Sequence, residues 1–360
     1  MKLVIDKLFE ERIPFKNDID LKSISYSCTG SEVEVYITPT CVDQLKLVIR
    51  ILKENNIDYI LSGGSTNLLY LDFVRYQCVV STTYIGNVDY DSVNGLVVVD
   101  SGYELSKFVR QNLIRGFVGY EGLEGIPGTI GGALFQNAGA YGYNISDHLV
   151  SVEVLDENNN VQVLMKDDCS FAMRESIFQK RKLIILRATF ENKKGDLNLA
   201  ASKIETYHIA RHAHQEWTYP NLGSSFVTST NVYDSFSQGK VVYKLLLIVV
   251  KIITNNSIYK RLFRGKPNNK LRNRLVQYFF GLNSYDNKFS DKSINTFVNK
   301  TGLSIDVIKY YRDLDEILGD DAKLENEIAY SGVSKIVDEA SNHIFMKIIE
   351  EHPRIKSKLK

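Results

Sequence analysis

A glycine-rich segment in the middle of the chain has the composition of a loop that contacts a ligand. Residues 122–142 contain seven glycines and three alanines, yet they keep the large apolar side chains Ile126, Ile130, Leu134 and Phe135. Glycine has no Cβ and accepts positive φ, so the N–H groups of such a segment can approach an anionic or planar ligand. Pro127 fixes one corner of the backbone. Flexible linkers are polar and serine-rich, so we interpret the segment as a binding loop instead of a linker.

A second glycine-rich turn occurs earlier in the chain. Ser62-Gly-Gly-Ser-Thr-Asn-Leu-Leu69 follows a short apolar run, Ile57 to Leu61, which has the character of a buried strand. The backbone amides of this turn could hold a phosphate. Strand ends often carry such turns for structural reasons alone, so the turn by itself does not identify a ligand.

The composition limits the class of protein. A chain of 360 residues is long enough for two or three domains with their own cores. The formal net charge is +1 and charges of both signs are spread along the chain, which argues against a nucleic-acid partner. No CxxC pair occurs among the cysteines, which favours reduced thiols in the core of a cytoplasmic protein. The four cysteines are Cys28, Cys41, Cys78 and Cys169.

Two further features bear on localisation and metals. The first eleven residues are interrupted by acids and lack the apolar core and cleavage site of a signal peptide, which also favours the cytoplasm. His212 and His214 could be mistaken for metal ligands. On a helix their side chains would point to different faces, and no third ligand is evident nearby, so we expect no metal site.

A long apolar stretch covers residues 241–253 and is broken only by Lys244 and Lys251. It is too short for a membrane span, which needs about 20 apolar residues. The basic residues that follow it are Lys260, Arg261, Arg264 and Lys266. Three alternatives remain open: a helix on an anionic membrane surface, a buried helix, or a contact between subunits.

The spacing of apolar residues predicts two α/β units. Alternation at Val33, Val35 and Ile37 predicts a strand within residues 25–38, and helical spacing predicts a helix over residues 42–55. The second unit is expected between residues 78 and 190. Its predicted elements are a helix over residues 103–115 and strands at residues 79–82, 96–99, 149–155 and 183–190.

A third region follows the two units. It begins with a helix near Leu197 and runs to Gly332. Beyond it, we expect residues 333–360 to form a separate amphipathic helix with a basic end.

Together the two glycine-rich segments resemble the flavin-binding loops of the UDP-N-acetylenolpyruvoylglucosamine reductase (MurB) family. Ile-Pro-Gly-Thr-Ile-Gly-Gly-Ala133 followed by Gln-Asn-Ala-Gly-Ala-Tyr-Gly142 is similar to one loop. Residues 62–69 are similar to the other, Gly-x-Gly-[Ser/Thr]-Asn-x-Leu, with Ser65 in place of the glycine at the third position of this pattern. The resemblance implies FAD bound by Gly63, Gly64, Ser65, Thr66, Asn67, Gly125, Ile126, Pro127, Gly128, Thr129, Gly131, Gly132, Asn137 and Gly139.

Three shorter motifs carry the catalytic residues that the resemblance implies. Met173-Arg-Glu-Ser-Ile-Phe178 is similar to Tyr-Arg-x-Ser-x-Phe, whose arginine contacts the substrate carboxylate, and this implies that role for Arg174. Residues 211–226 are similar to a family segment that contains the serine that protonates the substrate. Ser224 falls on that serine, and this implies the same role for it. Read without the family, this arginine would be a surface ion-pair partner and the serine a turn residue.

The third motif, Leu324-Glu-Asn-Glu-Ile-Ala-Tyr-Ser-Gly332, is similar to Leu-Glu-x-Glu-Val-x-x-x-Gly. Its second glutamate acts with the arginine and the serine in the family, which implies a catalytic role for Glu327. Glu325 is the alternative. Taken alone, a glutamate that begins a strand would be a solvated side chain.

The resemblance implies an α+β fold: a two-part FAD-binding α/β region of the vanillyl-alcohol-oxidase/PCMH type and a C-terminal α/β substrate-binding domain. The boundaries expected are 1–77 and 78–195 for the FAD-binding parts, 196–332 for the substrate-binding domain with an insertion at about 233–269, and 333–360 for the helical tail.

The reaction implied is the FAD-dependent reduction of UDP-N-acetylglucosamine enolpyruvate to UDP-N-acetylmuramate with NADPH, for peptidoglycan synthesis, by a cytoplasmic monomer. This chain differs from the family pattern at Ser65, Met173, Val227 and Ser293. A flavoprotein of the same fold with another substrate, and a non-catalytic FAD-binding paralogue, therefore stay open as alternatives.

Overall fold

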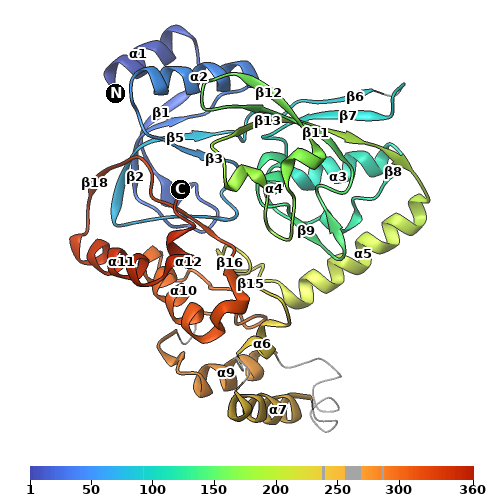
Figure 1. Ribbon diagram of the computed structural model, residues 1–360, viewed down its shortest axis with the longest axis vertical. Coiled ribbons are helices and arrows are strands. Elements are labelled where there is room, and N and C mark those ends of the chain that lie inside the picture. The colour runs from blue at the N-terminus through green and yellow to red at the C-terminus, as the bar shows by residue number, and fades with distance from the viewer. Residues whose placement is uncertain (92, 237–239, 256–268, 286–287) are drawn as a thin grey trace.

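The computed structural model describes residues 1–91, 93–236, 240–255, 269–285 and 288–360. Two five-stranded sheets occupy the upper part of the molecule in Figure 1, and a mostly helical part lies below them. Helices and strands alternate and mix within each part, so the fold class is α+β, as predicted.

The first sheet has the strand order β1-β2-β5-β18, and β3 pairs with the other half of β5 on the same side as β18. β2 and β3 run parallel to β5, whereas β1 and β18 are antiparallel to their neighbours. The strands are β1 (Phe15–Asp20), β2 (Glu32–Ile37), β3 (Ile60–Ser62), β5 (Val74–Ser81) and β18 (Val333–Ile336).

Two helices, α1 (Lys2–Glu10) and α2 (Val42–Glu54), pack on one face of this sheet. The apolar residues of α2 recur at spacings of three and four, which places them on one side of the helix. They are the buried residues Leu45, Val48, Ile49 and Leu52. The second half of β5, from Cys78 to Ser81, is buried at every position, because Val79 packs in one core and Cys78 and Val80 pack in another on the opposite face.

The second sheet has the order β12-β11-β13-β7-β6, and each neighbouring pair is antiparallel. The helices α3 (Leu105–Ile114) and α4 (Ile130–Phe135) share a core with this sheet. The strands are β6 (Val88–Asp91), β7 (Leu96–Asp100), β11 (Leu149–Leu155), β12 (Val161–Met165) and β13 (Ile184–Glu191).

Further helices lie below and beside the sheets (Figure 1). They are α5 (Leu197–His214), α6 (Val232–Ser235), α7 (Val241–Asn255), α9 (Asn269–Phe279) and α10 (Ser304–Leu318). The antiparallel pair of β15 (Phe226–Thr228) and β16 (Ala322–Leu324) lies with them. Short paired strands complete the fold: β8 (Phe117–Val118) with β14 (Lys193–Lys194), and β9 (Gly139–Ala140) with β10 (Tyr143–Asn144).

The chain then returns to the first unit. β17 (Glu327–Ala329) pairs in parallel with β4 (Leu68–Tyr70), the strand that follows the first glycine-rich turn. The largest hydrophobic core contains Tyr70 and Phe73 together with Phe226, Tyr310 and Tyr311. Residues from both ends of the chain therefore pack in one core, and the predicted domain boundaries stay a prediction.

The prediction of a separate helix for residues 333–360 is wrong. β18 joins the first sheet, and α11 (Glu339–Glu351) and α12 (Pro353–Lys356) follow it. Phe345 of α11 is fully buried, with its ring centroid 5.5 Å from that of Phe73 and 5.1 Å from that of Tyr330. The apolar face of α11, taken from the sequence as that of an independent helix, is part of the main core.

One other expectation needs correction. Cys78 and Cys169 are buried, but Cys28 and Cys41 are exposed. The strand predicted within residues 25–38 is confirmed as β2, which begins at Glu32.

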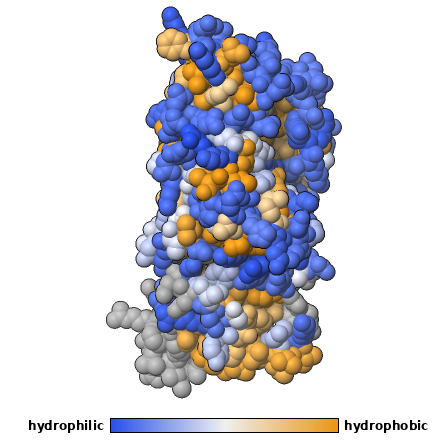
Figure 2. All heavy atoms as spheres, turned by 90° about the vertical axis from the view of Figure 1, so that its left-hand side faces the viewer, coloured by the Kyte–Doolittle hydropathy of each residue, from blue (hydrophilic) through white to orange (hydrophobic). Residues whose placement is uncertain are grey.

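α7 is a helix with one buried and one exposed side. Leu247 and Val250 are buried, but seven other apolar residues of the helix are exposed. A fully buried helix is therefore ruled out, and the subunit and membrane alternatives stay predictions. Figure 2 shows apolar atoms at the lower end of the molecule, where α7 lies in Figure 1. The exposed apolar residues are Val241, Val242, Leu245, Ile248, Val249, Ile252 and Ile253. The predicted basic cluster at residues 260–266 lies outside the described residues. None of the described helices is long and apolar enough to cross a membrane.

The packing of α11 predicts a large effect of a single truncation. Phe345→Ala should reduce the free energy of unfolding by about 3–5 kcal/mol, because it removes a fully buried ring and leaves a cavity. Urea unfolding followed by circular dichroism measures it, and exposed Glu350→Ala on the same helix is the control. Equal midpoints for both variants would mean that α11 does not belong to the main core.

Candidate active site

A cleft of about 1480 Å³ connects the two glycine-rich segments with the lower part of the molecule. Pockets for one small ligand usually have about 300–1,000 Å³, so this cleft has room for a dinucleotide and a second ligand. Arg174, Ser224, Glu325 and Glu327 line it. The lining also includes every residue named above as an FAD contact except Asn137.

The two glycine-rich segments touch each other through their glycines. A Cβ on Gly64 would lie 3.2 Å from the Cα of Gly128, and a Cβ on Gly128 would lie 2.8 Å from the Oγ1 of Thr66. Gly128 also has a φ of +112°, a backbone conformation that residues other than glycine rarely adopt. Thr66 Oγ1 donates a hydrogen bond to Pro127 O at 3.3 Å. The contact between the two loops by itself therefore favours glycine at positions 64 and 128.

Polar atoms along the cleft fit FAD, whose isoalloxazine edge and phosphates form hydrogen bonds. Ser101 Oγ, Gln136 Oε1 and Arg211 Nε are buried and have no hydrogen-bond partner within the part of the chain that the structure describes. All three residues line the cleft. Buried polar atoms normally have partners, so these atoms and the glycine loops are suited to a polar ligand.

Ser65, which replaces a family glycine, keeps the backbone that glycine would adopt. Its φ is +52°. Its hydroxyl accepts a hydrogen bond from Tyr26 N at 3.0 Å, which offsets part of the cost of that conformation. Asn137 lies outside the cleft lining. Its Nδ2 donates to Ala172 O at 2.9 Å, so it supports the turn that carries Arg174.

Arg174 lies in a tight turn in which Ala172 and Glu175 exchange backbone hydrogen bonds of 3.0 and 3.2 Å. Its φ of +57° is unusual for a residue with a side chain. The guanidinium donates to Gly139 O at 2.7 Å and to Asn137 O at 3.4 Å, and its Nε lies 2.9 Å from Glu325 Oε1. Since a guanidinium has five N–H donors, donors remain for a carboxylate.

The two candidate glutamates have different partners. Glu325, the alternative from the sequence, forms the ion pair with Arg174, and its side chain is 19% exposed. Burial raises the pKa of Glu325, and the charge of Arg174 opposes this. Glu327 begins β17 and is 6% exposed. Its Oε1 accepts a hydrogen bond from Gln136 Nε2 at 2.9 Å.

The fold gives two adjacent serines different exposure to solvent. Ser224 is exposed in the cleft wall, whereas Ser225 is buried. The backbone of Ser225 is used for structure: its N–H donates to Asn295 O, and its carbonyl accepts from Glu325 N, both at 2.7 Å. Of the two hydroxyls, that of Ser224 is therefore the one available to a ligand.

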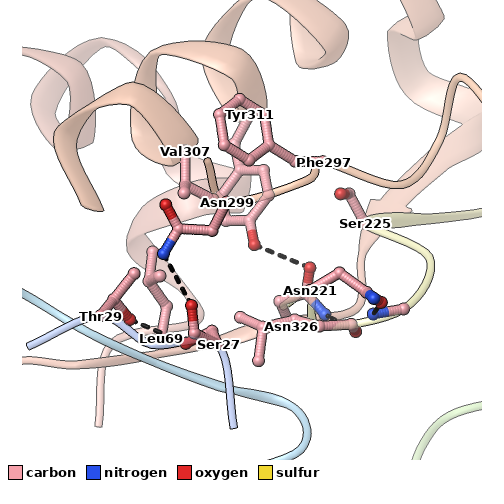
Figure 3. Close-up of a pocket in the computed structure, with 12 residues that line it drawn as sticks. Ser27, Thr29, Leu69, Asn221, Ser225, Phe297, Asn299, Val307, Tyr311 and Asn326 are labelled. Carbon is pink, nitrogen blue, oxygen red and sulfur yellow. Dashed lines mark hydrogen bonds between the residues drawn. The ribbon is translucent and has the colours of Figure 1, made fainter. Parts of the chain in front are cut away.

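Asn326, between the two glutamates, was missed by sequence reasoning because its motif position is variable in the family pattern. Its Nδ2 donates to Asn67 Oδ1 at 2.8 Å and to Leu222 O at 3.0 Å. Its Oδ1 accepts from Tyr311 OH at 2.8 Å, which Figure 3 shows beside a small cavity of about 10 Å³. The side chain thus joins the first glycine turn, the Ser224 segment and α10.

Gln136 and two lysines were also missed. Lys358 Nζ lies 3.6 Å from Glu327 Oε1, and Lys360 Nζ lies 3.4 Å from Glu327 Oε2. The sequence signal available was only a basic end, Arg354 to Lys360, and nothing in it indicated a distant acidic partner.

Among the residues that depart from the family pattern, Ser293 lines the cleft, and Val227 lies in β15. His212 stacks on Trp217 with ring centroids 5.1 Å apart. Within the described ranges, no group of three or more His, Cys, Asp or Glu side chains could hold a metal ion.

Comparison with known proteins gives a consistent result. The family of FAD binding domains matches residues 33–164. UDP-N-acetylenolpyruvoylglucosamine reductase of Caldanaerobacter subterraneus subsp. tengcongensis is 32% identical over 235 residues, which cover 64% of this chain and 77% of that protein. The enzyme of the same name from Clostridium novyi is 35% identical over 211 residues, covering 59% and 68%.

A solved structure has a similar fold. The crystal structure of UDP-N-acetylenolpyruvylglucosamine reductase from Thermus caldophilus has a TM-score of 0.59 at 20% identity and covers 88% of this chain and 98% of that chain. At this identity the likeness concerns the fold alone.

The contact between the glycine loops predicts a loss of cofactor binding. Gly128→Ala should weaken FAD binding at least about tenfold, because the new Cβ meets Thr66 and separates the loops. Fluorescence titration of apoprotein with FAD measures it.

Gly142→Ala is the matched control, since Gly142 also has positive φ, at +83°, but its Cβ would meet nothing within 4 Å. Equal FAD affinity in the two variants would contradict the assignment of the Gly128 segment to FAD.

Proposed function

The chain belongs to the UDP-N-acetylenolpyruvoylglucosamine reductase family of FAD-dependent oxidoreductases, and we propose from this that it reduces UDP-N-acetylglucosamine enolpyruvate to UDP-N-acetylmuramate with NADPH. The membership rests on 32% identity across 77% of a curated member. The substrate, the nicotinamide donor and the place in peptidoglycan precursor synthesis are parts of the proposal.

One observation carries the proposal. Arg174, Ser224 and the two glutamates come from three separate segments, and they line one cleft together with both glycine-rich segments. Convergence of an arginine, an exposed hydroxyl and buried carboxylates on a dinucleotide-sized cleft suits reduction of a substrate that carries a carboxylate.

Three of these side chains have a chemical task in this reaction, and the catalytic role of Glu327 that the resemblance implies stays a prediction. The two glycine-rich segments would hold FAD, which would supply the hydride chemistry between the nicotinamide donor and the enol ether. The free donors of Arg174 bind the substrate carboxylate and stabilise negative charge that develops beside it. Ser224 donates a proton to the carbon next to the carboxylate, which completes the lactyl ether. Glu325 holds Arg174 in position through their ion pair.

The assignment of Ser224 predicts a change in only one half-reaction. Ser224→Ala should leave flavin reduction by NADPH unchanged and slow flavin reoxidation by the enolpyruvyl substrate roughly 10²-fold, as for loss of a general acid. Anaerobic stopped-flow absorbance measures each half-reaction separately.

Ser225→Ala is the neighbouring control and should resemble the wild type, because the bonds of Ser225 are made by its backbone. Equal slowing of both half-reactions in Ser224→Ala would remove Ser224 from the role of proton donor. A wild-type protein that is reduced by NADPH but not reoxidised by this substrate would favour the alternative flavoprotein. A protein that binds no FAD would favour the non-catalytic alternative.

We also propose that the enzyme is a cytoplasmic monomer that does not bind nucleic acid and contacts an anionic membrane surface through α7. The support is the exposed apolar face of α7 next to the exposed lysines Lys240 and Lys244, since such a surface attracts both groups.

Cosedimentation with vesicles tests the membrane contact. The wild type should bind phosphatidylglycerol vesicles more strongly than phosphatidylcholine vesicles, and the double variant Ile248→Glu/Ile252→Glu should lose at least about tenfold in affinity. Equal binding of wild type and variant would contradict the contact. A wild-type dimer in light scattering that the variant abolishes would identify α7 as a subunit interface.

A further inference from the structure

Residues 358–360 lie in the candidate active site, where a β-bridge between Leu359 and Ile328 joins them to β17. Ile328 N donates to Lys358 O and Lys360 N donates to Ile328 O, both at 2.8 Å, and Tyr330 N donates to Lys360 O at 2.7 Å. β17 is thereby paired on both sides, with β4 on one and this segment on the other. Figure 1 places this end of the chain near the centre of the molecule.

The turn after α12 and the β-bridge at Leu359 bring both lysines to one partner, Glu327, whereas Leu359 points elsewhere. Leu359 packs against the main core. The two ammonium groups meet the two oxygens of Glu327, at 3.6 and 3.4 Å. The backbone pairing therefore fixes where the positive charges lie.

Lys360 is the lysine that the cleft exposes. It lines the cleft, its side chain is 32% exposed, and its Nζ lies 4.1 Å from the ring centroid of Phe135. Lys358, with 17% of its side chain exposed, is more enclosed. Burial lowers the pKa of Lys360, and Glu327 opposes this, so the ion pair favours the ammonium form.

The charges of the site show what the segment adds. Among the side chains, Arg174, Lys358 and Lys360 face Glu325 and Glu327, which leaves one positive charge when both glutamates are ionised. Without the two lysines the same group would carry one net negative charge and would repel a carboxylate. Gln136 Nε2 joins the two halves of the group, since it donates to Glu325 O at 3.1 Å and to Glu327 Oε1 at 2.9 Å.

We propose that Lys360 is a substrate-binding residue that, together with Arg174, receives the carboxylate of the sugar nucleotide, and that Lys358 and Glu327 position it. This inference rests on the proposed function. It assigns to Glu327 the task of holding an ammonium group at the cleft. If the lysines only offset the buried charge of Glu327, they would contribute to stability without discriminating between ligands.

A comparison of two ligands separates these roles. Isothermal titration of the oxidised holoenzyme measures binding of UDP-N-acetylmuramate, which has the lactyl carboxylate, and of UDP-N-acetylglucosamine, which lacks it. Lys360→Met should weaken binding of UDP-N-acetylmuramate at least about tenfold, as expected for a charged hydrogen bond, and change binding of UDP-N-acetylglucosamine by less than about twofold.

Matched variants complete the test. Lys360→Arg should retain most of the affinity for UDP-N-acetylmuramate, and exposed Lys356→Met on α12 should behave as the wild type. Lys360→Gln is measured beside Lys360→Met, so that poor folding of one variant does not decide the result. The flavin absorbance and thermal midpoint of each protein establish that it is folded.

Three outcomes would overturn the inference. Unchanged binding of both ligands in Lys360→Met and Lys360→Gln would leave Lys360 with a structural role only. Equal weakening of both ligands would mean that Lys360 does not recognise the carboxylate. If the wild type binds neither ligand and does not use the enolpyruvyl substrate, the proposed function fails and this inference fails with it, whereas a working wild type beside an unaffected Lys360→Met overturns the inference alone.

Discussion

The buried carboxylate of Glu327 is the constraint that brings the site together. A charge removed from water is costly unless partners surround it, and breaking a buried pair by removing one partner typically costs about 3–5 kcal/mol. Glu327 is 6% exposed, and its partners are Gln136, Lys358 and Lys360. Gln136 belongs to the second glycine-rich segment, and the two lysines belong to residues 358–360. Satisfying one carboxylate thus requires segments that lie far apart in the sequence to meet at one wall of the cleft.

The backbone of β17 makes the same connection by a second means. Its two edges are paired with β4 and with residues 358–360, so its N–H and C=O groups have partners in the interior. Glu327 N donates to Asn67 O at 2.9 Å, and Asn67 Nδ2 donates to Glu325 O at 3.0 Å. The first glycine-rich turn and the segment that carries both glutamates are therefore held together by direct hydrogen bonds. A cofactor held by that turn would have a defined position relative to the catalytic residues.

The two glutamates divide their tasks by what each can reach. Glu325 contacts Arg174, and Glu327 contacts the two lysines, so each carboxylate fixes one cationic group beside the cleft. Cations held in advance by buried carboxylates need little rearrangement when an anionic ligand arrives. The site can therefore be described as three cationic side chains that face two carboxylates, which leaves one positive charge among the side chains for a substrate. The amide of Gln136 bridges the two parts.

Local patterns in the sequence determined the elements and the family. Glycine spacing identified both loops, apolar periodicity placed α2 and most strands within a few residues, and short motifs indicated Arg174, Ser224 and Glu327. Only the tertiary structure decided that Glu325 and not Glu327 pairs with Arg174, that Ser225 is buried, and that Lys360 lies in the cleft. Backbone preferences act over a few neighbouring residues and can be read locally. The partner of a charge depends on which strands become adjacent, and Asn67 and Glu325, which are hydrogen-bonded, are 258 positions apart.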